Sequence, residues 1–440
     1  MVLQRRLGLI DFTLITIGSV IGSGIFRNPA VVAARAHAPL FIMLCWIVGG
    51  VLSIIAALVF AELSSRRPLD GGIYAYLREA YGSGIGFLFG WMVFWLMYTG
   101  ATAASAALFA GYLGPALGVH GNPRIIAVAA LACVTAINAL GLRQGTGWQN
   151  TLVVLKVSAI AALIVAGFVA HPLAAAASAH LASFSSPLQT VGALGVAMLP
   201  VLFSYNGFQS ATVMSAQIRE PARIMPRGMV IGVSIVIAIY LLVSTGCLRV
   251  MGASGLAASI TPAADVMHAA FGVGGSRFIA IAIALSTLGY MSTSILVAPR
   301  LYFQLAQDGM LFRQVGWVHP RTRVPLIAIL MHGTMAAVLA ASGTYEQIVN
   351  WVTLPDWTFI ALCAFALFIF RKRDSGSQEP VVQVPGHPYT TILLILAVLG
   401  VVLAEVTIYP MDSLYSVLVF LAGTAVYYTV VNRRLRTART

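Results

Sequence analysis

Residues 18–26 read Gly18-Ser19-Val20-Ile21-Gly22-Ser23-Gly24-Ile25-Phe26, and they interrupt the hydrophobic segment 15–30 at its middle. The hydrophobic segment 191–215 is interrupted in the same way by Phe203-Ser204-Tyr205-Asn206-Gly207-Phe208. Unwound backbone in a bilayer leaves peptide groups without partners, so it is tolerated only where it lines a protected cavity. Paired interruptions in the two halves of a chain are typical of a binding site at the membrane midplane.

The composition indicates an integral membrane protein. Of the 440 residues, 59% are hydrophobic and 9% are charged, whereas soluble domains carry about 25% charged residues. Several apolar runs reach the roughly 20 residues that a helix needs to cross a bilayer. The cysteines lie in apolar segments without metal-ligand spacing, so we expect buried thiols, no metal and no cofactor. They are Cys45, Cys133, Cys247 and Cys363.

We therefore expect an all-α protein with twelve transmembrane spans, of which the first and the sixth are broken. The predicted spans are residues 8–34, 38–62, 84–114, 123–140, 148–170, 191–217, 226–248, 275–305, 325–342, 346–370, 388–408 and 413–431.

The basic residues predict the orientation. With the N-terminus inside, Lys156 lies within a span and five arginines lie outside, so the other 20 of the 26 Lys and Arg residues are cytoplasmic. This asymmetry places both termini in the cytoplasm of a protein of the cell's inner membrane. The net charge of +13 then orients the chain and attracts anionic lipid, so the lipid bilayer, and not nucleic acid, is the expected partner. The outer arginines are Arg27, Arg35, Arg124, Arg249 and Arg277.

Four motifs in order resemble those of the amino acid–polyamine–organocation (APC) transporters, and together they cover most of the chain. They are residues 22–26 in the first span, residues 68–82 after the second, residues 219–221 with 226–228 after the sixth, and residues 299–302, 307–309 and 319–320 after the eighth. Ser204-Tyr205-Asn206-Gly207-Phe208 is similar to the Ser-Tyr-Asp-Gly-Trp of bacterial permeases related to the L-type amino acid transporters. The differences at Asn206 and Phe208 leave the preferred substrate side chain open.

The resemblance implies a LeuT-like fold of two inverted five-helix repeats. The transport core would be residues 1–370, with one repeat at about 8–170 and the other at about 191–370. Residues 371–440 would supply a cytoplasmic loop, two further helices and a short tail. The implied function is secondary active transport of amino acids by alternating access, without sodium, as an exchanger or a proton-coupled permease.

The first break provides groups for the substrate carboxylate. Backbone N–H groups at the start of the outer half-helix attract an anion, so we assign the carboxylate to Ser23, Gly24 and Ile25. Glycine suits this place because the backbone must approach the ligand closely. The alternative is that Gly18 and Gly22 only allow tight helix packing.

The substrate ammonium needs acceptors, which carbonyl groups released in both breaks would supply. The predicted substrate-binding residues are Val20, Ile21, Gly22, Ser23, Gly24, Ile25, Phe203, Ser204, Tyr205, Asn206, Gly207 and Phe208. No acidic residue lies within either break, which favours a neutral substrate over a cationic amino acid or a polyamine. Further aromatic candidates for the pocket wall are Trp95, Tyr98 and Tyr290, with ordinary helix packing as the alternative.

Lys156 lies within the fifth span, where a charge costs roughly 2.5–3.5 kcal/mol. The resemblance implies that its ammonium takes the place of sodium and binds carbonyls near Gly18 and Ser19, with Ser292 or Thr293 as further partners. The alternatives are a snorkelling lysine and a proton carrier.

Asp356, Tyr290 and Glu220 are candidates for gating or proton relay. Asp356 lies within the tenth span, where carboxyl groups are functional candidates, and a structural hydrogen bond is the alternative. Glu220 is expected to pair with arginines of the 63–83 loop, namely Arg66, Arg67 or Arg78. Glu405 is expected at the outer interface.

Other classes of function are less well supported. The sequence has no His-Glu-x-x-His motif, no Gly-x-Ser-x-Gly elbow and no phosphate-binding loop, so neither an intramembrane enzyme nor a primary pump is expected. A non-transporting amino acid sensor with the same fold stays an alternative. The sequence leaves the oligomeric state and any accessory subunit open.

Overall fold

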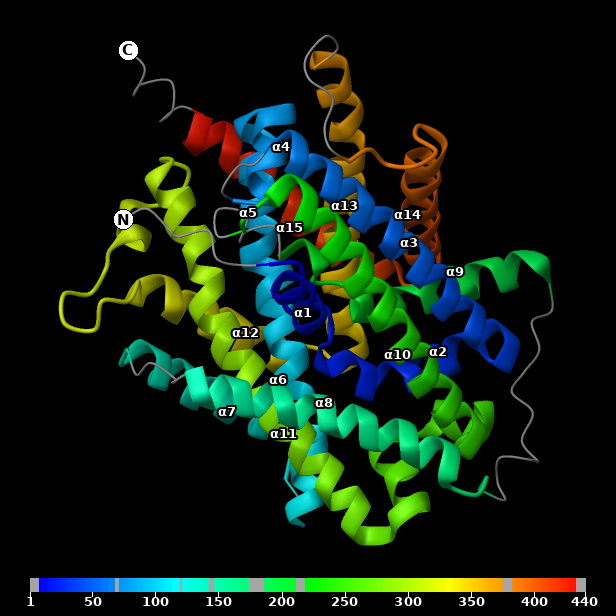
Figure 1. Cartoon of the computed structure of the whole chain (residues 1–440). Helices are drawn as coiled ribbons and strands as arrows, with labels where there is room; N and C mark the ends of the chain where they lie inside the picture. The colour runs from blue at the N-terminus through cyan, green and yellow to red at the C-terminus, as the bar shows by residue number, and fades with distance from the viewer. Residues whose placement is uncertain are drawn as a thin grey trace.

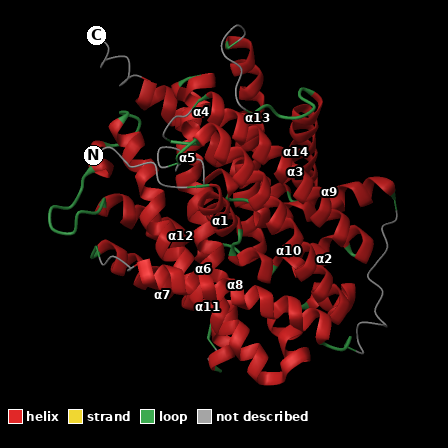
Figure 2. Ribbon diagram, in the orientation of Figure 1, coloured by secondary structure: helices red, strands yellow, loops and turns green. Residues whose placement is uncertain are grey.

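The computed structural model describes residues 8–67, 71–118, 121–141, 146–173, 186–210, 218–374 and 382–432, and the regular elements in these ranges are helices (Figures 1 and 2). The first half comprises α1 (Leu9–Val20), η1 (Ser23–Phe26), α2 (Asn28–Ala36), α3 (Pro39–Arg66), α4 (Ile73–Tyr81), α5 (Ser83–Met92), η2 (Val93–Met97), α6 (Tyr98–Leu117), α7 (Pro123–Ala139) and α8 (Thr146–Val169). The second half comprises α9 (Pro187–Tyr205), α10 (Pro221–Ala258), α11 (Pro262–Gln307), η5 (Arg313–Gly316), α12 (Leu326–Ser342), α13 (Tyr345–Arg373), α14 (Tyr389–Ile408), α15 (Pro410–Val426) and η6 (Tyr427–Val431).

Nine helices in the described part of the chain are long and apolar enough to cross a membrane. Three shorter apolar helices, α1, α7 and α12, lie in the ranges expected for the first, fourth and ninth spans. The helices thus occupy all twelve predicted ranges, while the crossing of the membrane by all twelve stays a prediction. The two inverted repeats also stay a prediction.

The broken first span lies inside the helix bundle. Figure 1 shows α1 near the middle of the view, with α10 beside it and α3 on the far side of α10. Glycines let α10 approach α1 closely, because a Cβ atom at Gly228 would lie 2.6 Å from the Phe12 ring and one at Gly232 would lie 2.9 Å from the Thr16 side chain. Small residues at such contacts are typical of helix packing in membranes.

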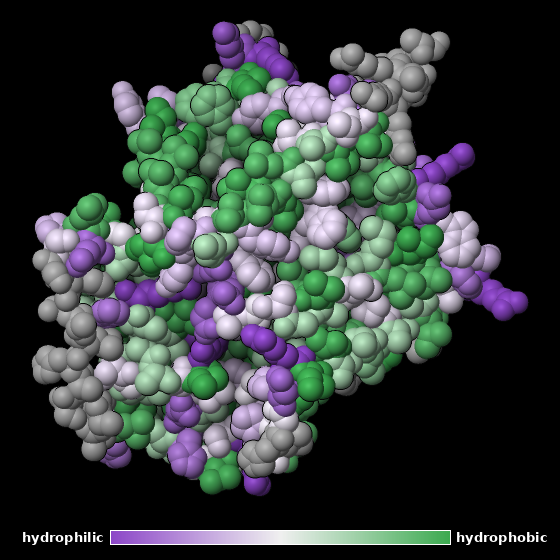
Figure 3. Space-filling model, turned by 180° about the vertical axis from the view of Figure 1, so that it is seen from behind, coloured by the Kyte–Doolittle hydropathy of each residue, from purple (hydrophilic) through white to green (hydrophobic). Residues whose placement is uncertain are grey.

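The outer helices present apolar side chains to their surroundings. Figure 3 shows hydrophobic side chains over much of one face, and on α14 the residues Leu393, Leu396 and Leu403 are more than half exposed. A soluble protein rarely exposes apolar area on this scale, whereas lipid is a suitable solvent for it. The chain is a multi-pass membrane protein.

Candidate functional site

The first break is present at the predicted place. α1 ends at Val20, the backbone of Ile21 and Gly22 is extended, and one turn of 3₁₀ helix, η1, leads to Arg27 and α2. The N–H groups of Ser23 and Gly24 have no acceptor among the described residues. Unpaired N–H groups at a helix start favour an anion, so the backbone offers the donors that the sequence analysis assigned to a carboxylate.

The second break begins where α9 ends at Tyr205. Asn206 is extended, Gly207 has φ +113°, and a short turn continues to Ser210. The predicted inner half of this span falls partly on residues 211–217, which lie outside the described residues, as do residues 68–70 of the second motif.

The two breaks contact each other. A Cβ atom at Gly24 would lie 3.3 Å from both the Phe203 ring and the Ser204 hydroxyl. A Cβ atom at Gly207 would lie 2.3 Å from the carbonyl oxygen of Ser19. Gly207 is therefore required by its close approach to the α1 backbone, a side chain at Gly24 would force its neighbours to shift, and the two interrupted helices meet at their interruptions.

Asn28 joins the outer halves of the broken helices. Its Nδ2 donates to the Ser204 hydroxyl (2.7 Å) and to the Pro200 carbonyl (2.9 Å), while its Oδ1 accepts from the Tyr345 hydroxyl (2.9 Å). Asn28 is fully buried, and the sequence analysis did not single it out. Its position two residues after the first break was the available signal.

Side chains already occupy two of the carbonyls that were predicted to bind the substrate ammonium. The Tyr240 hydroxyl donates to the Val20 carbonyl (3.2 Å), and the Lys156 ammonium donates to the Ile21 carbonyl (2.5 Å). A carbonyl oxygen has two lone pairs, so each retains one for another donor. Lys156 thus binds at the first break, two residues beyond the expected Gly18–Ser19, and Tyr240 is a contact that sequence reasoning missed.

Asp356 lies at the second break. It is buried on α13, and its Oδ2 accepts a hydrogen bond from Nδ2 of Asn206. The argument for a neutral substrate rested on the lack of an acidic residue within the breaks, and the fold brings one there from a distant helix. The carboxylate is also close enough to the hydroxyls of Tyr98 and Tyr290 for electrostatic interaction.

The aromatic candidates fall into two groups. Phe203 faces Gly24, and Tyr290 is 42% exposed, so both stay candidates for the pocket wall. Phe208 is buried edge-to-face against Phe60, and Tyr205 donates its hydroxyl to the Trp46 carbonyl. For these last two, the contacts favour ordinary packing.

The pairing predicted for Glu220 is not the one observed in the described part of the chain. Its carboxylate is exposed and lies 4.0 Å from Arg223 of the next turn. Arg66 pairs instead with Glu62 and Asp374, Arg67 with Glu79 and Asp374, and Arg78 with Asp308. The arginines of the 63–83 loop pair with carboxylates that lie nearer than Glu220. These are Glu62 of α3, Glu79 of α4, Asp308 at the end of α11 and Asp374 at the end of α13.

Asp374 is the centre of this network, which lies at the end of the bundle predicted to be cytoplasmic. Burial alone would raise the pKa of its carboxyl, but hydrogen bonds from Arg67 and Arg66 hold the pKa below its usual value. Glu62 is fully buried beside it, and its carboxylate accepts bonds from Arg66, Arg371 and the backbone N–H of Val384. The inner ends of α3 and α13 are therefore held together.

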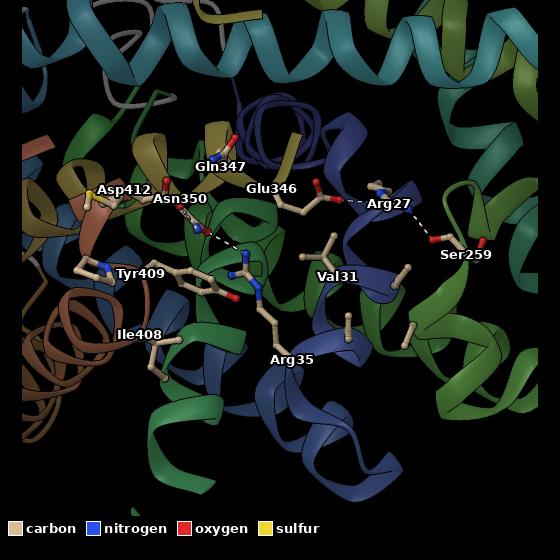
Figure 4. A pocket seen from close by; sticks show the side chains of 15 residues that line it. Arg27, Val31, Arg35, Ser259, Glu346, Gln347, Asn350, Ile408, Tyr409 and Asp412 are labelled. Atoms are coloured by element: carbon tan, nitrogen blue, oxygen red, sulfur yellow. Dashed lines mark hydrogen bonds and ion pairs between the residues drawn. The ribbon is translucent and has the colours of Figure 1, made fainter. Parts of the chain in front are cut away.

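A cavity of about 630 Å³ lies beside α2, on the side that the sequence analysis predicts to be external, and it is called the outer cavity below (Figure 4). At one end Arg27, the residue after η1, forms an ion pair with Glu346 (2.6 Å) and also donates to the Ser259 carbonyl (2.5 Å). This contact connects the first broken helix with α13 and with the segment between α10 and α11.

Arg35 lines the other end of the outer cavity. The guanidinium donates to the Val196 carbonyl (2.8 Å) and to Asn350 (3.0 Å), and Asn350 in turn donates to Asp412 (3.1 Å). Figure 4 shows Tyr409 beside the same guanidinium. These contacts join α2, α9 and α13 to the α14–α15 turn.

Glu405, which was expected at the outer interface, lies three residues before the end of α14, but its side chain is enclosed by protein. It is fully buried, and both of its carboxylate oxygens lack a partner among the described residues. The reason is that α14 packs closely on α9 here, where Ala404 contacts Gly195.

Comparison with known proteins relates the chain to transporters. Residues 7–431 match the family model described as "Amino acid permease". The "Serine/threonine exchanger SteT" of Bacillus subtilis is 29% identical over 441 residues, which is 98% of each chain. The "b(0,+)-type amino acid transporter 1" of Homo sapiens is also 29% identical, over 98% of this chain and 88% of the relative. An uncharacterized transporter of Mycobacterium tuberculosis is 30% identical over 87% of this chain and 84% of its own.

Proposed function

This chain belongs to the amino acid permease family, and on that premise we propose that it is a secondary active transporter that moves neutral L-amino acids across the cytoplasmic membrane by alternating access. The match confirms the resemblance to the APC superfamily, and the names of two relatives support amino acid transport as the activity. The choice of neutral substrates, the coupling and the orientation with both termini inside are parts of the proposal.

The contact between the two breaks is the observation that carries the proposal. Gly24 lies against Phe203 and Ser204, and Gly207 lies against Ser19. Two interrupted helices that meet in this way enclose unwound backbone inside protein, which is the condition under which a membrane tolerates it. The substrate carboxylate would accept hydrogen bonds from the N–H groups of Ser23 and Gly24, with Ile25 beside them.

The substrate ammonium would bind the acceptors on the other side of the break. The carbonyls of Val20 and Ile21 each retain one lone pair beside Tyr240 and Lys156. An ammonium has three donors, so it can bind more than one of these oxygens.

Lys156 would make the transporter independent of sodium. Its ammonium lies against the end of α1, bonded to the Ile21 carbonyl, where the negative end of the helix dipole favours a cation. A fixed positive charge at this place supplies what a bound metal cation would otherwise supply. We therefore favour exchange of amino acids, with proton coupling as the other form of the proposal.

Counterflow in proteoliposomes tests this function. Vesicles loaded with one unlabelled amino acid should accumulate a labelled one, with the same rate in sodium and in choline buffers. A panel of amino acids defines the substrates, and an imposed pH gradient separates exchange from proton symport. Saturable binding without any counterflow would favour the sensor alternative. The absence of both binding and counterflow with every amino acid of the panel would refute the proposal.

A further inference from the structure

The buried carboxylate of Asp356 is the one acidic group that the described structure brings to the breaks, and its orientation is fixed by a chain of hydrogen bonds. The N–H of Gly207 donates to Gln209 Oε1 (3.1 Å), and Gln209 Nε2 donates to Asn206 Oδ1 (2.6 Å). Because the Asn206 oxygen is used in this way, its Nδ2 faces Asp356 and donates to Oδ2. The second break therefore holds the carboxylate in a defined position.

The other carboxylate oxygen of Asp356, Oδ1, has no hydrogen-bond partner among the described residues. The Asp356 residue is 3% exposed, whereas Glu405, whose two oxygens also lack a partner among the described residues, is fully buried. A carboxylate oxygen that is nearly buried and unpaired costs free energy unless a donor reaches it. This geometry leaves a place for a donor that comes from outside the protein.

The open oxygen lies beside the groups proposed to hold the substrate backbone. Asn206, its hydrogen-bonding neighbour, is one residue before Gly207, which contacts the Ser19 carbonyl at the end of α1. Tyr290, which is 42% exposed, interacts electrostatically with the same carboxylate. A side chain that extends from a substrate held between the breaks would meet Asp356.

We infer that Asp356 determines substrate specificity by accepting a hydrogen bond from the substrate side chain. The preferred substrates are then amino acids whose side chain ends in a hydrogen-bond donor, either a hydroxyl or an ammonium group. A site built to bind a donor rejects an analogue that lacks it, because a buried polar group is then left unpaired. This inference rests on the proposed function but revises its choice of neutral substrates, because an amino acid whose side chain ends in an ammonium group is cationic.

Competition with isosteric pairs tests the inference in the unmodified protein. Threonine and valine differ by a hydroxyl for a methyl group, and lysine and norleucine differ by an ammonium for a hydrogen. We expect the donor-bearing member of at least one pair to inhibit counterflow at about tenfold lower concentration. The threonine pair tests the hydroxyl and the lysine pair tests the ammonium. Equal inhibition within both pairs overturns the inference, whereas no inhibition by any amino acid refutes the proposed function itself.

The variant Asp356→Asn tests the role of this carboxylate directly. We expect the preference for the donor-bearing member to fall to about twofold or less, with inhibition by the apolar member changed far less. Asp412→Asn is the matched control, because Asp412 is a buried carboxylate on the outer cavity that also accepts a bond from an asparagine. It should shift both members of a pair by the same factor.

A swapped double variant, Asn206→Asp with Asp356→Asn, separates recognition from packing. It returns a carboxylate to the same pair of side chains from the other helix, so the donor preference should recover. If Asp356→Asn weakens all competitors equally and the swap restores transport without any preference, Asp356 only holds Asn206 in place and the inference is wrong. Should neither variant fold, the isosteric pairs in the unmodified protein decide.

Discussion

At the scale of single residues, glycines 24 and 207 are required for different physical reasons. Gly24 has an ordinary backbone conformation, and its lack of a side chain leaves room for Phe203, Ser204 and the open N–H groups. Gly207 has φ +113°, a region that L-residues with a side chain rarely adopt, and it also touches the backbone of α1. Substitutions at the two positions should therefore affect different properties.

Replacement of Gly24 by leucine should abolish substrate binding without preventing membrane insertion. A side chain at this position would enter the space between the breaks, where Asn28 is only 3.0 Å from the Cβ position. Binding of labelled substrate to the purified protein measures the effect, and elution as a single species measures folding. Gly18→Ala is the control, since a Cβ at Gly18 meets nothing within 4 Å. Normal uptake by Gly24→Leu would remove the assignment of the carboxylate site.

Lys156→Ala should lower the exchange rate by about tenfold or more, because the Ile21 carbonyl loses a charged donor. The measurement is counterflow over a range of pH and sodium concentration. Lys372→Ala is the control, because Lys372 lies in the last turn of α13 at the cytoplasmic end. An unchanged rate and pH profile in Lys156→Ala would contradict the role of a fixed cation.

Residues close together in sequence were predicted well, and contacts between distant helices were not. The break residues and Lys156 follow from local pattern, since glycine and polar residues inside apolar spans are visible in the sequence. The bonds of Asp356 and Tyr240 join residues that are 150 and 220 positions apart, so no local pattern marks them. The neutral-substrate argument failed to consider Asp356 for this reason.

At the scale of elements, the two broken helices depend on each other's geometry. The helical ranges were predicted well because long apolar segments and the glycine breaks are strong signals. The partners of the cytoplasmic arginines were not predicted correctly, because Arg66, Arg67 and Arg78 can each reach several carboxylates and the fold selects among them. The contact of α1 with the end of α9 has a direct test.

Gly207→Ala should push α1 and α9 apart. The added Cβ would lie 2.3 Å from the Ser19 oxygen, at a backbone conformation unsuited to alanine. We expect a loss of about 1–3 kcal/mol from strain alone, seen as a lower melting temperature in detergent. Gly111→Ala is the control, because a Cβ there has open space. Equal melting temperatures for the two variants would show that the breaks do not pack as described.

At the scale of the whole molecule, an ion pair joins helices at the end of the bundle proposed to be external, and a network joins helices at the end proposed to be cytoplasmic. Arg27 and Glu346 are partly exposed, so their contact is of the strength that a conformational change can break. By contrast, the fully buried Glu62 holds Arg66 and Arg371 through several bonds at the cytoplasmic ends. Alternating access requires the two sides to open in turn, and the outer pair can be tested alone.

Glu346→Gln should favour opening of the outer side. Loss of about 1 kcal/mol of attraction to Arg27 changes the population of the open state by about fivefold. A cysteine introduced at Ala30, which lines the outer cavity and is almost fully buried, should then react faster with an impermeant maleimide. Cys133, which is exposed, is replaced by serine in all variants. Glu79→Gln, at the cytoplasmic end, should leave the reaction rate unchanged, and no acceleration in Glu346→Gln would contradict the gate.

The bonds of Arg35 have a practical consequence for inhibition. One guanidinium holds the Val196 carbonyl of α9 and Asn350 of α13, and Asn350 extends the restraint to Asp412 at the α14–α15 turn. A compound that bound beside this arginine would hold α2, α9, α13 and the α14–α15 turn together and arrest the transport cycle. Such a drug would need no likeness to an amino acid, and raising the nutrient concentration would not displace it.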